Sequence, residues 1–187
     1  MKLISNTGTN RVIDVLRQSV QPGASLDIAT PFLSLFAFAE LRDLFNQAMH
    51  SRLILPLDAE SELMLLGSAA DRSARNRLHV RWLARECANW IREKTELRQS
   101  SSLLPQSAYL VRQTNMAQSQ VITGNCPLTT DGLGLAPGNQ FSLIQCTETP
   151  REVELFAAWY ESLWNAMTTS GQAKERILAH LQEISDH

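Results

Sequence analysis

Residues with catalytic or metal-binding side chains are few in this sequence and widely spaced. The four histidines and three cysteines stand singly, without the HExxH or CxxC spacing that brings two metal ligands together. Three aspartates near the ends of predicted strands, Asp27, Asp58 and Asp131, are candidates for metal-assisted hydrolysis, but their scatter argues against a shared ion. We therefore expect no structural or catalytic metal and no cofactor.

One loop has the composition of an anion-binding turn. The stretch VITGNCPLTTDGLG, residues 121–134, begins with residues that favour an extended chain and breaks at Gly124 into a polar, glycine-bearing loop. The main-chain amides of Gly124 and Asn125, together with the hydroxyls of Thr129 and Thr130, would suit a phosphate or sulfate. The alternative is a well-packed turn that binds nothing.

A row of arginines is the second candidate site. Residues 72–98 hold eight of the 17 basic residues and three of the 19 acidic ones. At about 100° per residue of a helix, four of the arginines share one face opposite an apolar face: Arg77, Arg81, Arg85 and Arg92. Such a row predicts salt-sensitive contacts with DNA phosphates, and Trp82 beside it would stack on a base. The alternative is a solvated helix whose arginines pair with nearby acids.

The elements that must position these residues alternate between helices and strands. Helices are predicted over residues 10–20, 36–49, 150–167 and 172–184, with a break at 168–171, and strands over 25–32, 52–57, 107–113, 119–124 and 140–147. Residues 59–99 contain no proline, which predicts a shorter helix and then a long one from about residue 73. The β-α-β order at residues 25–57 favours parallel strands, so the predicted class is α/β, a mixed sheet flanked by helices.

The composition is that of an ordinary folded domain, with 44% hydrophobic and 19% charged residues. A length of 187 residues suits one core plus an appendage. No apolar run approaches the roughly 20 residues that a membrane span needs, and the amino terminus lacks the apolar core of a secretory signal. Single, unpaired cysteines suit a reducing compartment, so we expect a cytoplasmic protein with no membrane contact.

The order of elements and two local patterns resemble phospholipase D-like domains at the front of bacterial helicases and restriction-associated proteins. SLDIATPFLSLFAFAELRDLF followed by RLILPLD resembles their opening, and VITGNCPLTTDGLGLAPGNQFSLIQC with a Trp-rich helix ending ESLW resembles their second half. The resemblance covers most of residues 3–167. It implies a degenerate phospholipase D-like half, a single HKD-type domain at residues 1–168, with 169–187 as a carboxy-terminal helix or a linker to a downstream region.

Active members of that family carry an HxK pair on one strand and a GSxN-like turn after the next. The histidine attacks phosphorus and the lysine neutralises the phosphate oxygens. Here Pro105 and Ser107 stand at the HxK positions, or Gln106 and Ala108 if the register slips by one. The other replaced family positions are Asn125 and Pro127 in the turn and Gln140 near the last strand.

Proline offers no nucleophile and serine offers no charge, so we expect that this domain is not an enzyme. The resemblance then implies a non-catalytic module, the amino-terminal domain of a helicase or restriction/defence protein, acting in DNA binding or assembly. One alternative is a residual phosphodiesterase or nuclease, for which His79 is the histidine to test. Another is a pure homodimerisation or partner-docking domain. The expected partners are a second copy, DNA, and a downstream helicase domain or subunit.

Overall fold

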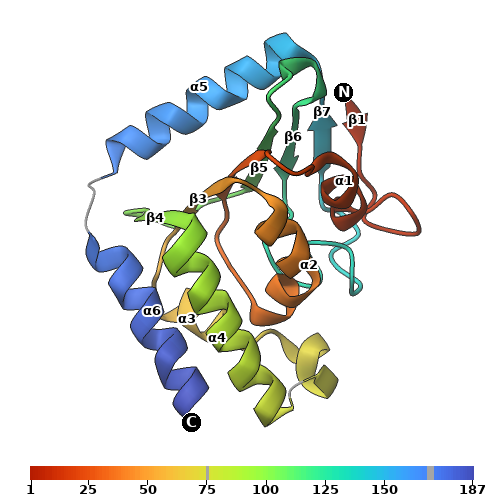
Figure 1. Ribbon diagram of the computed structural model, residues 1–187. Helices are drawn as coiled ribbons and strands as arrows, with labels where there is room; N and C mark the ends of the chain where they lie inside the picture. The colour runs from red at the N-terminus through yellow and green to blue at the C-terminus, as the bar shows by residue number, and fades with distance from the viewer. Residues whose placement is uncertain (75, 168–170) are drawn as a thin grey trace.

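A single mixed β-sheet organises the chain in the computed structural model, which describes residues 1–74, 76–167 and 171–187. Within these residues the sheet has seven strands in the order β1-β7-β6-β5-β2-β3-β4 (Figure 1). The strands are β1 (Lys2–Leu3), β2 (Ser25–Ala29), β3 (His50–Leu55), β4 (Thr95–Gln99), β5 (Ser107–Arg112), β6 (Gln120–Gly124) and β7 (Ile144–Thr147). Strands β2, β3 and β4 run parallel, and the other neighbouring pairs are antiparallel.

Helices cover both faces of this sheet. They are α1 (Val12–Ser19), α2 (Leu35–Gln47), α3 (Ala59–Met64), α4 (Arg77–Lys94), α5 (Pro150–Ala166) and α6 (Gly171–Asp186), with short 3-10 helices η1 (Ala69–Ala74) and η2 (Met116–Gln118). Helices α1, α2, α4 and α6 share the main apolar core with one face of the sheet, whereas α5 packs on a smaller apolar cluster at the opposite face. The predicted α/β class with a mixed sheet and flanking helices is confirmed. None of the described helices is both long and apolar enough to cross a bilayer.

Strand β4 replaces the end of the long helix predicted from the sequence. Helix α4 begins later than expected, because the Asn76 side chain caps it by accepting from the amides of Leu78 and His79. It ends at Lys94, and the next five residues pair with β3. Thr95 and Leu97 are buried while their neighbours are not, so the period-two pattern of a strand was present in the sequence.

Helix α6 lies beside α4, and each helix caps the other. The Lys174 ammonium, in the first turn of α6, donates to the main-chain oxygens of Arg92 and Thr95 at the end of α4. At the other end, Arg77 in the first turn of α4 donates from Nε to the main-chain oxygen of His187, 2.7 Å away. The expected break at 168–171 and the domain boundary after residue 168 fall on residues of which 168–170 lie outside the described part of the chain.

Helix α5 is attached to the sheet by polar contacts centred on a buried carboxylate. Asp27, 2% exposed, accepts two hydrogen bonds from Arg52, at 2.8 and 3.0 Å, and one from Arg112. Arg52 also donates to Glu161 of α5, which holds the pKa of that carboxyl below its usual range. The Tyr160 hydroxyl donates to the main-chain oxygen of Ile28 at 2.9 Å. These contacts fix one side of α5 close to β2 and β3.

Candidate functional site

The turn after β6 requires glycine at its first position. Gly124 has a φ of 137°, and a Cβ added there would lie 2.1 Å from the main-chain oxygen of Leu143, the residue before β7. The next amide, that of Asn125, donates to the same oxygen at 3.1 Å, and the Asn125 side chain donates to Ser142. The Asn125 amide is therefore committed to the sheet rather than to an anion.

The two threonine hydroxyls of the predicted anion site also have partners, and these partners are acidic. Thr129 donates to Asp131 at 2.6 Å, and Thr130 donates to Asp71 at 2.7 Å. Both threonines and Asp71 are buried. A bound phosphate would face these carboxylates, so the loop supports the alternative of a packed turn more than an anion site.

The two possible registers of the HxK pair place side chains on opposite faces of the sheet. Ser107 is 1% exposed, and its hydroxyl donates to that of Thr30 at 3.1 Å, which in turn accepts from the amide of Leu128. Pro105 is exposed in the loop before β5. Gln106 and Ala108, the pair for the slipped register, line a cavity at the opposite face, since successive strand residues alternate between faces.

Three other family positions line a common polar cavity. Asn125, Pro127 and Gln140 border a space of about 220 Å³ together with Asn6 and Asp131. Uncharged amide groups and one carboxylate dominate this lining. Within the described residues, no group of three or more His, Cys, Asp and Glu side chains has a metal-binding arrangement.

The thiol of Cys126, between two residues of this cavity, is held in its protonated form. Cys126 is fully buried, and burial raises its pKa to about 12. The thiolate is the reactive form of cysteine, and almost none is present at neutral pH with such a pKa.

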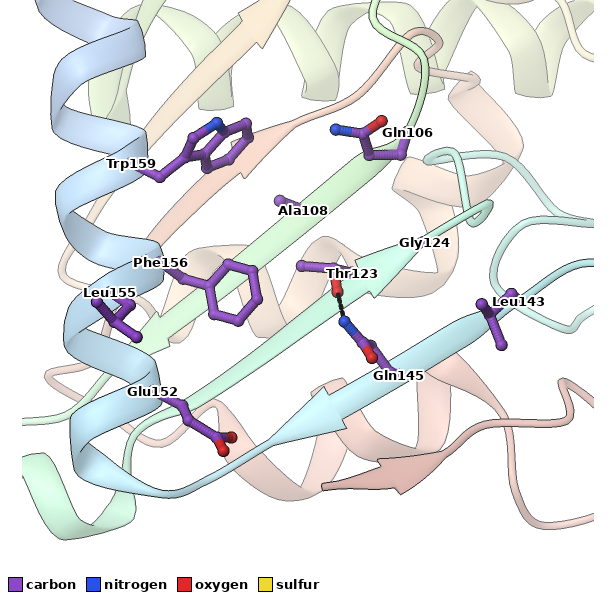
Figure 2. A pocket seen from close by; sticks show the side chains of 10 residues that line it. All are labelled: Gln106, Ala108, Thr123, Gly124, Leu143, Gln145, Glu152, Leu155, Phe156 and Trp159. Atoms are coloured by element: carbon purple, nitrogen blue, oxygen red, sulfur yellow. Dashed lines mark hydrogen bonds between the residues drawn. The ribbon is translucent and has the colours of Figure 1, made fainter.

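An apolar groove lies between α5 and strands β5–β7 (Figure 2). Its volume is about 540 Å³. Helix α5 supplies Glu152, Leu155, Phe156 and Trp159, the strands supply Ala108, Thr123, Gly124 and Gln145, and Gln106 and Leu143 complete the border. We call this space the α5 groove.

The α5 groove combines aromatic walls with one charged group. Phe156 and Trp159 extend from α5 over Ala108 and Thr123, and Glu152 lies two helical turns from Trp159 (Figure 2). Gln145 donates to Thr123 at 3.1 Å, and Thr147 donates to Glu152. The polar groups of the floor therefore satisfy one another, and the open surface is mainly apolar.

The predicted arginine row is divided by α6. Arg77 and Arg81 donate to main-chain oxygens of His187 and Asp186 at the end of α6. Arg85 and Arg92 are exposed, with no carboxylate within salt-bridge distance in the described residues, and Arg92 donates to Asn89. Two of the four guanidinium groups thus remain open for a polyanion.

The exposed Trp82 ring already has two neighbours. The His79 ring stacks on it with centroids 5.9 Å apart, and the Arg42 guanidinium lies 5.0 Å from its centroid. Base stacking by Trp82, predicted from the sequence, would require these side chains to share or leave the ring surface.

Comparison with known proteins gives matches among solved structures, but none among protein-family models or curated proteins. Among solved structures, the chain is similar to the crystal structure of a phospholipase D family member, Nuc from Salmonella typhimurium. The two share 14% sequence identity with a TM-score of 0.48, over 84% of this chain and 86% of that one.

This match corrects one prediction. We expected that the domain is not an enzyme, whereas the solved structure it resembles is that of a phospholipase D family member. That prediction was wrong, because the side chains at Pro105 and Ser107 describe only two positions and do not exclude chemistry carried by others. The helicase association and the DNA contact stay predictions.

The α5 groove was not found from the sequence. The helical period of α5 gives one apolar face around Val153 and Tyr160, and Leu155 lies well outside this face. Apolar residues on both sides of a helix were the available signal, since a helix packed on a single layer needs only one apolar face.

Proposed function

We propose that this chain is an assembly module in which two copies pair through the face that carries the α5 groove. The observation that supports this proposal is the exposure of large apolar side chains around the groove. Leu143 is 67% and Leu155 66% exposed on its border, and Phe141, two residues before Leu143, is 84% exposed. Contiguous exposed apolar surface on a folded domain marks interaction sites.

A second copy is the occupant that suits this face best. In a two-fold symmetric pair each copy uses the same surface, so that surface must contain both a projecting group and a space that receives it. The groove has a volume of about 540 Å³ and Trp159 in its lining is 39% exposed, while the exposed Phe141 comes two residues before Leu143 of the border. The aromatic ring of one copy would enter the groove of the other, where aromatic anchors contribute most to binding. If a helicase or restriction domain follows in a longer chain, this pairing would bring two such domains together.

The test is the dissociation constant for self-association, measured by sedimentation equilibrium. Leu155→Arg places a charge at the border of the groove and should weaken pairing by about tenfold or more, as should Phe141→Asp. The matched control is Leu63→Arg on α3, because Leu63 is 72% exposed and lies outside the groove. This control should pair like the unaltered chain.

Two outcomes would contradict the proposal. One is a chain that stays monomeric up to about 1 mM, because the affinity of its self-association would then be too low for a specific dimer. The other is a dimer that loses no affinity with Leu155→Arg or Phe141→Asp, since its interface would then lie elsewhere.

A further inference from the structure

A second cavity lies between α4 and α6, apart from the α5 groove and the turn after β6. Its volume is about 520 Å³, within the range of small-molecule sites. Its lining consists of Leu66 after α3, of Arg77, Val80 and Arg81 from α4, of His180, Glu183 and Ile184 from α6, and of His187 directly after α6. The two helices run side by side at this position (Figure 1). We call this space the α4–α6 cavity.

The spacing of the lining residues gives the cavity regular walls. The α4 residues are three and four positions apart, and the α6 residues follow the same pattern over two turns. Residues with this spacing share one helix face, so each helix directs one continuous strip toward the cavity. The site is therefore built on two packed helices rather than on a loop.

A guanidinium group in this cavity is incompletely satisfied. The Nε atom of Arg81 is buried and has no hydrogen-bond acceptor within the described residues. The other contact of this guanidinium, from Nη2 to the main-chain oxygen of Asp186, is long at 3.4 Å. A buried charged donor without an acceptor is costly, so an acceptor that reaches Arg81 would bind with a substantial gain.

The remaining lining favours an anion with an apolar part. Val80 and Ile184 are partly buried beside Leu66 and form an apolar wall. Two guanidinium groups face one carboxylate, that of Glu183, whose side chain is 75% exposed and thus screened by solvent. A cation would meet two like charges here.

The geometry points to the α4–α6 cavity as a binding site for a small amphipathic anion, a carboxylate or phosphate monoester with a short alkyl chain. The anionic oxygens accept from the Arg81 guanidinium, whose planar fork suits both head groups. The alkyl chain lies on Val80, Ile184 and Leu66. The head group alone would leave the apolar wall uncovered, and the alkyl chain alone would leave the Arg81 donor without an acceptor.

Calorimetric titration with matched eight-carbon compounds tests this site. Octanoate and octyl phosphate should each bind with a stoichiometry of one, about tenfold or more tighter than octanol, which lacks the charge. Inorganic phosphate, which lacks the chain, and octyltrimethylammonium, which has the opposite charge, should also bind at least about tenfold more weakly. The ratio of the two anion affinities identifies the preferred head group.

Arg81→Gln should weaken binding of the preferred anion by about tenfold or more, since it removes the charged donor. The control is Arg85→Gln, one turn further along α4 and outside the cavity, which should leave the affinity unchanged. Leu155→Arg should likewise have no effect, which separates this site from the α5 groove. Nitrogen-detected NMR of arginine Nε–H groups in the unaltered chain should show Arg81 shifting on titration, a readout that needs no variant to fold.

Equal binding of octanol and octanoate would overturn the assignment, because the charge would then play no part. An unshifted Arg81 Nε–H at saturating anion, or equal losses for Arg81→Gln and Arg85→Gln, would also overturn it. None of these results bears on pairing through the α5 groove.

Discussion

The two faces of the sheet are covered in different ways. One face shares a continuous apolar core with α1, α2, α4 and α6, in which the Phe45 and Trp90 rings stack with centroids 4.3 Å apart. The other face carries α5 over a smaller apolar cluster, with the ion pairs of Asp27 and the hydrogen bond of Tyr160 as additional attachments. The first face is held mainly by apolar area, whereas the second combines a smaller apolar area with a few directional polar contacts. The polar contacts of Tyr160 and Glu161 attach α5 along the side near β2 and β3, and the α5 groove lies along the side that faces β5–β7.

The largest expected effect comes from removing the buried carboxylate under α5. Asp27→Asn leaves Arg52 and Arg112 facing a neutral amide in a buried position, and breaking a buried pair in this way costs about 3–5 kcal/mol. The free energy of unfolding in urea measures this loss. Asp14→Asn, which affects a more exposed pair with Arg11, is the control and should cost much less. Equal losses would show that α5 does not depend on its ionic attachment.

A smaller effect should distinguish the two faces through matched tyrosines. Tyr160→Phe removes a buried hydrogen bond to the oxygen of Ile28, and Tyr109→Phe removes one to the oxygen of Cys126 at the other face. Each should cost about 1–2 kcal/mol because the carbonyl loses its partner. Hydrogen exchange should accelerate in α5 for Tyr160→Phe alone. Faster α5 exchange in both variants would mean that the two faces are not held independently.

The smallest effect is a pH dependence at Glu161. Its pKa is lowered by the hydrogen bond from Arg52, so its contribution to stability is present above the pKa of an unfolded glutamate, about 4.3, and is lost as the pH falls through the folded value. Glu161→Gln should therefore be less stable than the unaltered chain at neutral pH and equally stable well below about pH 4. A difference in unfolding free energy that does not change with pH would contradict this assignment.

Local patterns predicted most of the architecture. Local sequence patterns predicted β2, β3, β5 and β6 within a few residues. The helical period predicted an apolar face of α4 opposite the arginines, and Leu83, Cys87 and Trp90 are buried in this helix. Strand β4 was missed because Thr95 and Leu97 also continue the apolar face of the preceding helix. Over only five residues, the helical period of about 3.6 and the strand period of 2 are difficult to distinguish.

The sites were harder to predict because their partners are distant in the sequence. Helical angles placed Arg77 and Arg81 on one face correctly, yet His187, which accepts from Arg77, lies 110 residues away. The Thr130 hydroxyl was predicted to be free for an anion, but its acceptor Asp71 comes from η1. The residues around a hydrogen-bonding group do not indicate its partner when that partner is distant in the sequence and is brought near only by the fold.

The reciprocal capping of α4 and α6 fixes the axial position of the last helix. Lys174 and Arg77 act at opposite ends of a contact about 25 Å long, given the rise of a helix per residue. A slide of α6 by one turn, about 5.4 Å, would separate both cations from their carbonyl oxygens at once. Both polar attachments are therefore made together only at the axial position that α6 occupies here.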